Sequence, residues 1–89
     1  MNSFAKQVYN VVLRIPVGQV RTYKWVAKKV GRPKAVRAVG RALKNNPYPL
    51  IIPCHRVIKS DGKLGGYVFG VGTKRMLLNL ERQIKKLVL

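Results

Sequence analysis

Acidic residues, cysteine and histidine are all scarce in this chain of 89 residues. Asp61 and Glu81 are the only carboxylate side chains, and Cys54 and His55 are the only cysteine and the only histidine. A single cysteine excludes an intramolecular disulfide and favours a reducing compartment, so we expect a cytoplasmic protein. These four side chains cannot form a closed zinc site without a partner chain, so we expect no metal and no cofactor.

Long apolar runs are absent as well. No stretch approaches the roughly 20 residues that cross a bilayer, and the N-terminus has no signal-peptide pattern. We therefore expect no membrane partner. A chain of this length forms one domain with a single modest core, and we expect residues 1–89 to be that domain, working as a monomer.

Positive charge is what the sequence has in excess. Nineteen lysines and arginines give a formal net charge of +17. Such an excess repels itself in the folded state, and polyanion binding, most often to nucleic acid, is the usual reason for it. A membrane-surface or ribosomal-type basic protein is the alternative. No Ser/Gly linker, repeat or low-complexity tail is present, so the charge belongs to a folded domain. In a prokaryote, we expect that domain to be associated with the nucleoid.

Four segments have the features of helices. Ser3 is a candidate N-cap for the first, and Pro16-Val17-Gly18 ends it. Thr22 can cap a short second helix that ends at Gly31. Pro33 suits the start of a third, from about Lys34 to Lys44. Two helices joined by a glycine-containing turn predict a helix-turn-helix.

The third predicted helix has one basic side. Apolar residues lie on the opposite side, and the basic side chains fall within a sector of about 80°. The basic residues are Lys34, Arg37, Arg41 and Lys44. Ala35 and Ala38 lie near that sector, so a smooth strip beside cations suits close approach to a DNA groove. A solvated charged face is the alternative for this helix taken alone.

The segment after this helix contains both turn signals and glycines. Residues 60–63, Ser-Asp-Gly-Lys, predict a turn between two short extended pieces, which we call the wing. The glycines that follow permit close backbone approach to a ligand. We therefore predict a mainly α domain with a small β wing, similar to a winged helix-turn-helix.

The last predicted helix has an unexpected acid on its apolar side. Thr73 is its candidate cap, and the expected apolar stripe consists of Leu77, Leu80, Ile84 and Val88. Glu81 projects within that stripe, at about 40° from Leu77. A carboxylate on a core-facing side is costly unless it is paired, so we expect a specific partner. His55 is one candidate, and an ion pair with a lysine or arginine is the other.

Cys54 and His55 lie side by side between the apolar pairs Ile51-Ile52 and Val57-Ile58. A thiol in that setting is typical of a nucleophile whose reactive thiolate is favoured by a neighbouring base. Adjacent strand residues point to opposite faces, so His55 can serve Cys54 only if the chain turns there. The alternative is a small buried hydrophobe beside a satisfied polar residue.

The residues from Phe4 to Glu81 resemble the C-terminal, DNA-binding and catalytic domain of O6-alkylguanine-DNA alkyltransferases. The core match is Ile52-Pro53-Cys54-His55-Arg56-Val57. Further matches, in order, are Arg37-Ala38-Val39-Gly40, Asn46-Pro47, Gly65-Gly66-Tyr67, Lys74, Leu77-Leu78 and Glu81. Order and spacing both fit across nearly the whole chain.

The resemblance implies a single-turnover methylated-DNA–protein-cysteine methyltransferase that takes the alkyl group from O6-alkylguanine in double-stranded DNA. Cys54 would accept the alkyl group, and His55 would take the thiol proton through a water. Glu81 would orient His55 and stabilise its imidazolium form. Asn46 would be the hinge between the recognition helix and the cysteine segment.

The resemblance also implies residues that hold substrate and DNA. Arg37 would fill the stack after a nucleotide flips out, and Tyr23 would crowd the target phosphate and contact the flipped base. The carbonyls of Cys54 and Val57 would receive the guanine amino group. The remaining implied substrate contacts are Gly65, Tyr67, Val68 and Lys74. Lys34, Ala35, Ala38, Arg41 and Lys44 complete the implied DNA-binding set, in a minor-groove arrangement.

Two departures from the family pattern stand out. The family also carries an N-terminal domain that we do not expect here, and Val68 stands where a polar residue is usual. Alkyltransferase-like proteins, which bind alkylated DNA without transfer, are the alternative, but they lack the cysteine. A plain winged-helix DNA-binding module is a further alternative that leaves Cys54, His55 and Glu81 without a role.

Overall fold

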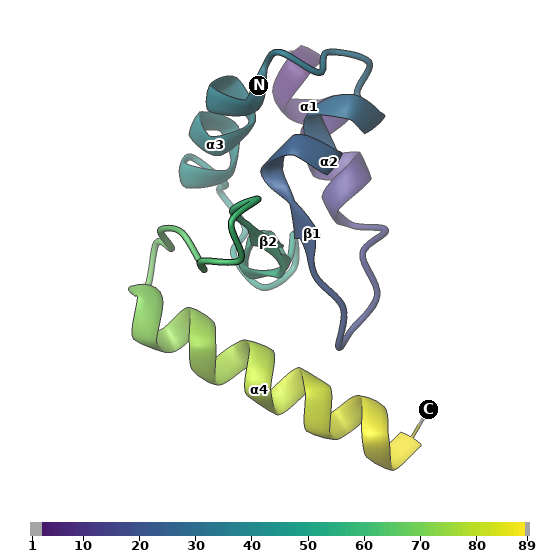
Figure 1. The fold of residues 1–89 in the computed structure, drawn as a ribbon, viewed down its shortest axis with the longest axis vertical. Coiled ribbons are helices and arrows are strands. Elements are labelled where there is room, and N and C mark those ends of the chain that lie inside the picture. Colours follow the sequence, from purple (N-terminus) through teal and green to yellow (C-terminus); the bar gives the residue numbers. More distant parts are fainter. Residues whose placement is uncertain (1–2, 89) are drawn as a thin grey trace.

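Helices dominate residues 3–88, the part of the chain that the computed structural model describes. The elements in order are α1 (Ser3–Val12), β1 (Arg21–Thr22), α2 (Tyr23–Lys29), α3 (Val36–Lys44), the 3₁₀ turn η1 (Cys54–Arg56), β2 (Val57–Ile58) and α4 (Val71–Val88). Figure 1 shows α1, α2 and α3 gathered at one end of the long axis, the strands in the middle and α4 lying across the other end. A mainly α domain with a small sheet is confirmed. No helix within residues 3–88 is long and apolar enough to cross a membrane.

The helix-turn-helix forms from α2 and α3, as the sequence predicts. Thr22 is the N-cap of α2, because its hydroxyl accepts a 3.0 Å hydrogen bond from the Trp25 N–H. Gly31 follows the helix with a φ of 78°, a conformation that glycine adopts at little cost. The helix α3 begins at Val36 rather than near Lys34, because the Ala35 N–H still closes a turn on the Arg32 carbonyl.

The small sheet joins segments that lie far apart in the sequence. β1 pairs with β2 in parallel, with Arg21 opposite Val57 and Thr22 opposite Ile58. The predicted turn at residues 60–63 is present, closed by a 2.9 Å hydrogen bond from the Lys59 N–H to the Lys63 carbonyl. Residues 63–67 form no strand, so the wing is a loop and the expected second extended piece is wrong. Glycines at 62, 65 and 66 explain this, because glycine is unfavourable in strands.

The core lies between the helix-turn-helix and α1. Fully buried valines from α1, α2, α3 and β2 meet there: Val8, Val12, Val26, Val39 and Val57. Tyr9 adds a polar link, because its hydroxyl donates a 2.6 Å hydrogen bond to the Ala42 carbonyl. Ala42 belongs to the last turn of α3, where carbonyls have no partner within the helix. Tyr9 therefore ties α1 to the end of the recognition helix.

The inward face of α4 differs from the apolar stripe that the sequence predicts. Lys74 and Leu78 are the buried residues of this helix, whereas Leu80, Ile84 and Val88 are 52%, 40% and 69% exposed. The predicted Thr73 cap is also wrong, because the helix begins at Val71. The inward positions i, i+4 and i+7 of this helix are Lys74, Leu78 and Glu81. Two of the three side chains that attach α4 to the rest of the domain are therefore polar.

We expect Tyr9→Phe to lower the free energy of unfolding by about 1 kcal/mol, because it leaves the Ala42 carbonyl without its donor. Denaturant unfolding followed by circular dichroism measures this. Tyr48→Phe is the matched control, since Tyr48 is 57% exposed. Equal effects of the two substitutions would contradict a role for Tyr9 in holding α3.

Candidate active site

The chain turns at Cys54, as a contact between the thiol and the histidine requires. Pro53 precedes the 3₁₀ turn η1, and the Cys54 N–H donates a 2.7 Å hydrogen bond to the Ile52 carbonyl. Cys54 is 6% exposed and His55 is 1% exposed. The unpaired thiol is therefore held in a fixed, nearly buried position beside the one imidazole of the chain.

His55 is oriented by Glu81 of α4. Its Nε2 lies 2.8 Å from Glu81 Oε2. A carboxylate can only accept, so neutral His55 carries its hydrogen on Nε2 and its lone pair on Nδ1. The Nδ1 atom is buried and has no hydrogen-bond partner among the described residues. This tautomer leaves His55 with a free basic nitrogen inside the site.

Glu81 has a second partner, Arg56. Arg56 Nε donates to Glu81 Oε1 at 2.9 Å, and Arg56 Nη2 donates to Oε2 at 2.7 Å. Burial raises the pKa of Glu81, but the hydrogen bonds and charges of Arg56 and His55 outweigh it and lower the pKa overall. Both expected partner types, the histidine and an arginine, therefore bind this carboxylate.

Asn46 joins the end of α3 to the cysteine segment. Its Nδ2 donates a 2.9 Å hydrogen bond to the Ile52 carbonyl, and its Oδ1 accepts one of 2.9 Å from the Tyr48 N–H. Asn46 is 7% exposed, so its amide spans a buried junction. Asn46 therefore fixes the path of the chain from α3 to Cys54, at the position where the resemblance implies a hinge.

A pocket of about 600 Å³ opens beside Cys54. Its walls come from α2, from the end of α3, from η1 and from the glycine-rich loop. The lining residues are Tyr23, Gly40, Leu43, Lys44, Asn45, Cys54, Gly66, Tyr67 and Val68. The structure thus brings together four predicted residues of the site, Cys54, Tyr23, Tyr67 and Val68, around one cavity.

The glycine-rich loop approaches Tyr23 closely at Gly65. Gly65 has a φ of 75°, and a Cβ there would lie 3.1 Å from the Tyr23 hydroxyl oxygen. Tyr67 packs edge-on against the His55 ring, with 6.1 Å between ring centroids. The Tyr67 hydroxyl is buried without a hydrogen-bond partner among the described residues. Burial raises the pKa of Tyr23 and of Tyr67, so both phenols stay neutral at neutral pH.

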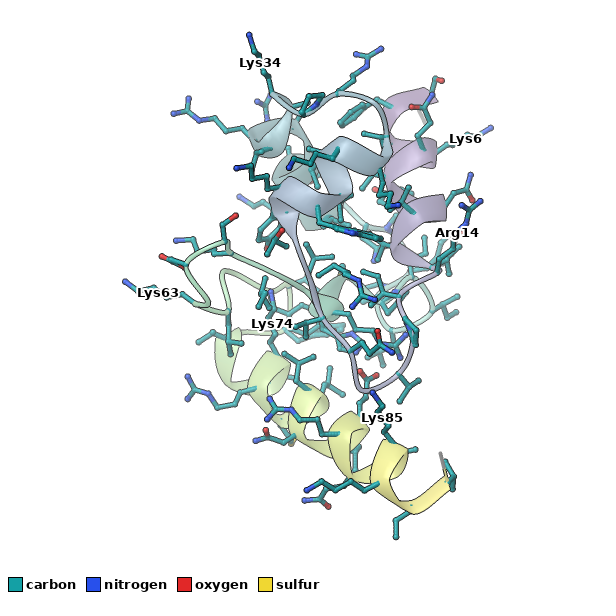
Figure 2. The ribbon with its side chains drawn as sticks, turned by 45° about the vertical axis from the view of Figure 1, so that its right-hand side comes forward. Lys6, Arg14, Lys34, Lys63, Lys74 and Lys85 are labelled. Atoms are coloured by element: carbon teal, nitrogen blue, oxygen red, sulfur yellow. The ribbon has the colours of Figure 1, made fainter. Side chains whose placement is uncertain are left out.

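Lys74 is a completely buried cation. Its Nζ donates to the Val57 carbonyl at 2.7 Å and to the Gly66 carbonyl at 3.3 Å. Burial lowers the pKa of Lys74 to about 8, against a smaller opposing effect of Cys54. Figure 2 shows Lys74 in the interior above α4, whereas Lys34 and Lys63 extend away from the ribbon. Lys74 joins the glycine-rich loop to the cysteine segment through these two carbonyls.

The basic residues predicted on the recognition helix are all exposed. They are Lys34, which precedes α3, and Arg37, Arg41 and Lys44 on it. Ala35 and Ala38 lie half-buried between them. Lys44 lines the Cys54 pocket, and Arg41 lines a separate hollow of about 430 Å³ between α1 and α3. One end of the cationic face therefore borders the pocket that contains the thiol.

A family model for the DNA-binding domain of 6-O-methylguanine DNA methyltransferase matches residues 3–83. The chain belongs to this family. Its sequence is 54% identical over 78 residues to the methylated-DNA–protein-cysteine methyltransferase of Methanosarcina barkeri, covering 88% of this chain and 49% of that protein. The chain thus spans about half the length of the curated relatives that it matches first.

Solved structures of the methyltransferase family have the same fold. Mycobacterium tuberculosis OGT in complex with DNA superposes with a TM-score of 0.91 at 46% identity, covering 93% of this chain and 52% of that one. Schizosaccharomyces pombe Atl1, in complex with damaged DNA containing O6-carboxymethylguanine, gives 0.79 at 37% identity, covering 91% and 77%. The chain therefore has the fold of the methyltransferase DNA-binding domain, as the resemblance implies.

Arg56 belongs to this candidate site, although the sequence alone predicts no role for it. It was part of the matched segment, and an arginine partner for Glu81 was an open alternative, but nothing in the sequence distinguishes it from the other arginines. Gly40, Leu43 and Asn45 also line the pocket without having been expected there. Gly40 and Leu43 of α3, and Asn45 directly after it, lie on the side of the helix that faces Cys54. The residue pattern of one helix does not show which of its sides faces another segment.

We predict that this domain becomes more stable at alkaline pH, because the buried Lys74 then loses its charge in the folded chain. Its pKa is about 8 in the folded chain, against an ordinary 10.5. Between these values the unfolded chain binds more protons, so the free energy of unfolding rises with pH, by roughly 3 kcal/mol at most.

Urea unfolding at about pH 7 and about pH 10 measures this effect. Lys74→Met is the comparison, because it removes this one titrating group and keeps the other lysines of the chain. The rise with pH should be smaller in Lys74→Met than in the unsubstituted chain. The same rise in both chains would show that Lys74 keeps its ordinary pKa.

Proposed function

We propose that this chain repairs DNA by transferring an alkyl group from O6-alkylguanine in duplex DNA to Cys54, once per molecule. The observation that supports it most directly is a lone thiol on the wall of a 600 Å³ pocket, next to a histidine held by a buried carboxylate. The relatives named as methyltransferases support the same reaction. We also propose that the chain acts as a cytoplasmic monomer.

The chemistry is a single displacement. The Cys54 sulfur forms a bond to the alkyl carbon while the bond between that carbon and guanine O6 breaks. The bonding electron pair leaves with the guanine oxygen, and the proton given up by Cys54 balances that charge. The product is guanine and a thioether, and no oxidant, reductant or cofactor is consumed. A thioether is stable, and the chain has no second thiol that could take the alkyl group from Cys54, so the protein acts once.

The proton path runs from Cys54 to His55. His55 Nδ1 is the free basic nitrogen of the site, so it is the atom that takes the thiol proton, through a water. Glu81 stabilises the imidazolium that results, because its carboxylate lies 2.8 Å from Nε2. Asn46 keeps the cysteine segment in place at the end of α3.

The pocket and the loop would hold the flipped base. Tyr23 and Tyr67 offer aromatic surface in the pocket that contains Cys54, and Val68 adds apolar surface there. Gly65 lets the loop approach Tyr23. Lys74 would act from behind, by fixing the Val57 carbonyl that receives the guanine amino group. A carbonyl oxygen has two lone pairs, so it can accept from both donors.

DNA would lie along α3. The alkyl carbon is inaccessible inside a duplex, so the nucleotide must leave the stack before Cys54 can react with it. Lys34, Arg41 and Lys44 would contact phosphates, and the small side chains of Ala35 and Ala38 would let the helix approach the groove. Arg37 would occupy the gap left in the stack.

Binding of alkylated DNA without transfer is the second candidate. The similarity to S. pombe Atl1 supports it. The presence of Cys54 in the pocket favours transfer instead, because the thiol occupies the position where an alkyl group would react.

We predict that incubation with duplex DNA containing O6-methylguanine adds one methyl group to the peptide that contains Cys54. Intact mass followed by peptide mapping detects this change. Cys54→Ala should lose transfer while it keeps most of its affinity for DNA. Repeated turnover by one protein molecule would contradict the single-use mechanism, and binding without a mass change would favour the second candidate.

We predict different consequences for Arg37→Ala and Lys44→Ala. Lys44→Ala should weaken binding to any duplex and reduce the slope of log K against log salt by about one, because one phosphate contact is lost. Arg37→Ala should instead slow transfer from duplex DNA at saturation, because the flipped state loses the side chain that replaces the base.

The free base separates the two roles. Transfer from free O6-methylguanine needs no flipping, so it should be unaffected by Arg37→Ala. The ratio of duplex rate to free-base rate at saturation is the quantity to compare between the two variants. If both variants lose the same fraction, Arg37 is only another phosphate contact.

A further inference from the structure

Arg56 binds both oxygens of the carboxylate that orients His55. Its Nε and Nη2 lie 2.9 Å and 2.7 Å from Glu81 Oε1 and Oε2, and the Oε2 atom also receives His55 Nε2 at 2.8 Å. A third bond, from Arg56 Nη1 to the Ile15 carbonyl at 2.9 Å, fixes the guanidinium from the side of α1. His55 therefore shares the Glu81 carboxylate with Arg56, and three hydrogen bonds fix the position of the Arg56 guanidinium.

This cluster is screened from solvent. The side chains of His55, Arg56 and Glu81 are 2%, 13% and 12% exposed. Asp61, the only other acid in the chain, is exposed in the turn at residues 60–63 and does not reach the site. Charges interact strongly in such an environment. The Arg56 charge should therefore interact directly with the His55 imidazole.

We propose that Arg56 is a positioning residue that keeps His55 neutral by neutralising Glu81. Neutral His55 faces a carboxylate and a guanidinium whose charges cancel. Without Arg56 it would face an uncompensated carboxylate, which favours the imidazolium. An imidazolium has no lone pair on Nδ1 and cannot take the Cys54 proton, so the arginine preserves the base at neutral pH. This inference rests on the proposed alkyl transfer, in which His55 is that base.

The other ionisable groups around His55 do not replace Arg56. Lys74 of α4 is a cation, but it donates to the carbonyls of Val57 and Gly66 rather than to Glu81. Tyr67 of the glycine-rich loop packs against the imidazole ring, and burial raises its pKa, so it stays neutral. Cys54, on the same turn as His55, is the group whose proton is transferred. Arg56 is thus the cation that decides how strongly Glu81 acts on His55.

The single histidine makes the test direct. The imidazole NMR signals of the protein come from His55 alone, so its titration midpoint can be read without assignment. Arg56→Met should raise that midpoint by about one pH unit or more, because an unneutralised carboxylate remains. Glu81→Gln should lower it, because only the guanidinium remains. The double variant should return close to the midpoint of the unsubstituted chain.

A conservative variant separates charge from packing. Arg56→Lys keeps the cation without the two-pronged contact, so it should restore most of the original midpoint while thermal stability stays reduced. Where Arg56→Met does not fold, Arg56→Gln removes the charge and keeps an N–H donor, and the same rise is expected. A midpoint that is unchanged or lower in a folded Arg56→Met or Arg56→Gln chain would overturn the proposal and leave Arg56 a purely structural residue.

Transfer supplies an independent reading. In a single-turnover assay with O6-methylguanine duplex, the acid limb of the rate profile should move to higher pH in Arg56→Met and to lower pH in Glu81→Gln. An acid limb that stays in place in both variants would overturn the link between Arg56 and the proton acceptor. The NMR titration uses no DNA, so failure of the transfer reaction itself leaves that measurement intact and is recognised separately.

Discussion

One largely shielded carboxylate, Glu81, holds the cysteine turn against the C-terminal helix. Glu81 is the only acid within the folded interior, and it accepts from two neighbouring residues of the cysteine turn, His55 and Arg56. Arg56 continues the link to the Ile15 carbonyl, so three parts of the chain converge on this group. The other acid of the chain, Asp61, is exposed in the turn at residues 60–63 and does not replace it. Fold and chemistry therefore depend on the same ionic contact.

Polar groups perform structural work elsewhere in this small domain. Lys74 is buried on α4 and satisfies two carbonyls, and Asn46 spans the junction after α3. A buried lysine without a carboxylate partner is energetically costly, and its lowered pKa reflects that cost. The domain thus gives up stability in order to fix backbone atoms around the pocket, which is a common feature of sites that must be positioned before the substrate arrives.

Sequence patterns reveal the local structure of this chain better than its tertiary pairings. Thr22 and the glycine at 31 define α2 because capping and positive φ are local effects. The parallel pairing of Arg21 with Val57 joins residues 36 positions apart, and two-residue strands give no alternation to detect it. A second short extended piece was expected after the turn at 60–63, but the glycines at 65 and 66 make the segment a loop.

The site follows the same division. The adjacent Cys54 and His55 and the inward Glu81 are visible as chemical anomalies, and the family resemblance gave them roles. The apolar stripe expected on α4 was wrong beyond Leu77, because Leu80, Ile84 and Val88 are exposed. Hydrophobicity was taken to mark the buried face, whereas Lys74 lies on that face beside the expected Glu81. Arg56 escaped notice because 18 other basic residues surround it in the sequence. Only the distances to Glu81 distinguish it.

The helix-turn-helix is attached to the cysteine segment at both of its ends. Before α2, β1 pairs with β2 directly after the cysteine turn, and after α3 the Asn46 amide bonds to the Ile52 carbonyl just before it. Because the helix-turn-helix is held at two points, it does not rotate about either of them. The thiol therefore has a fixed position relative to α3. In the proposed reaction, the flipped nucleotide then moves to a thiol whose place the protein has already set.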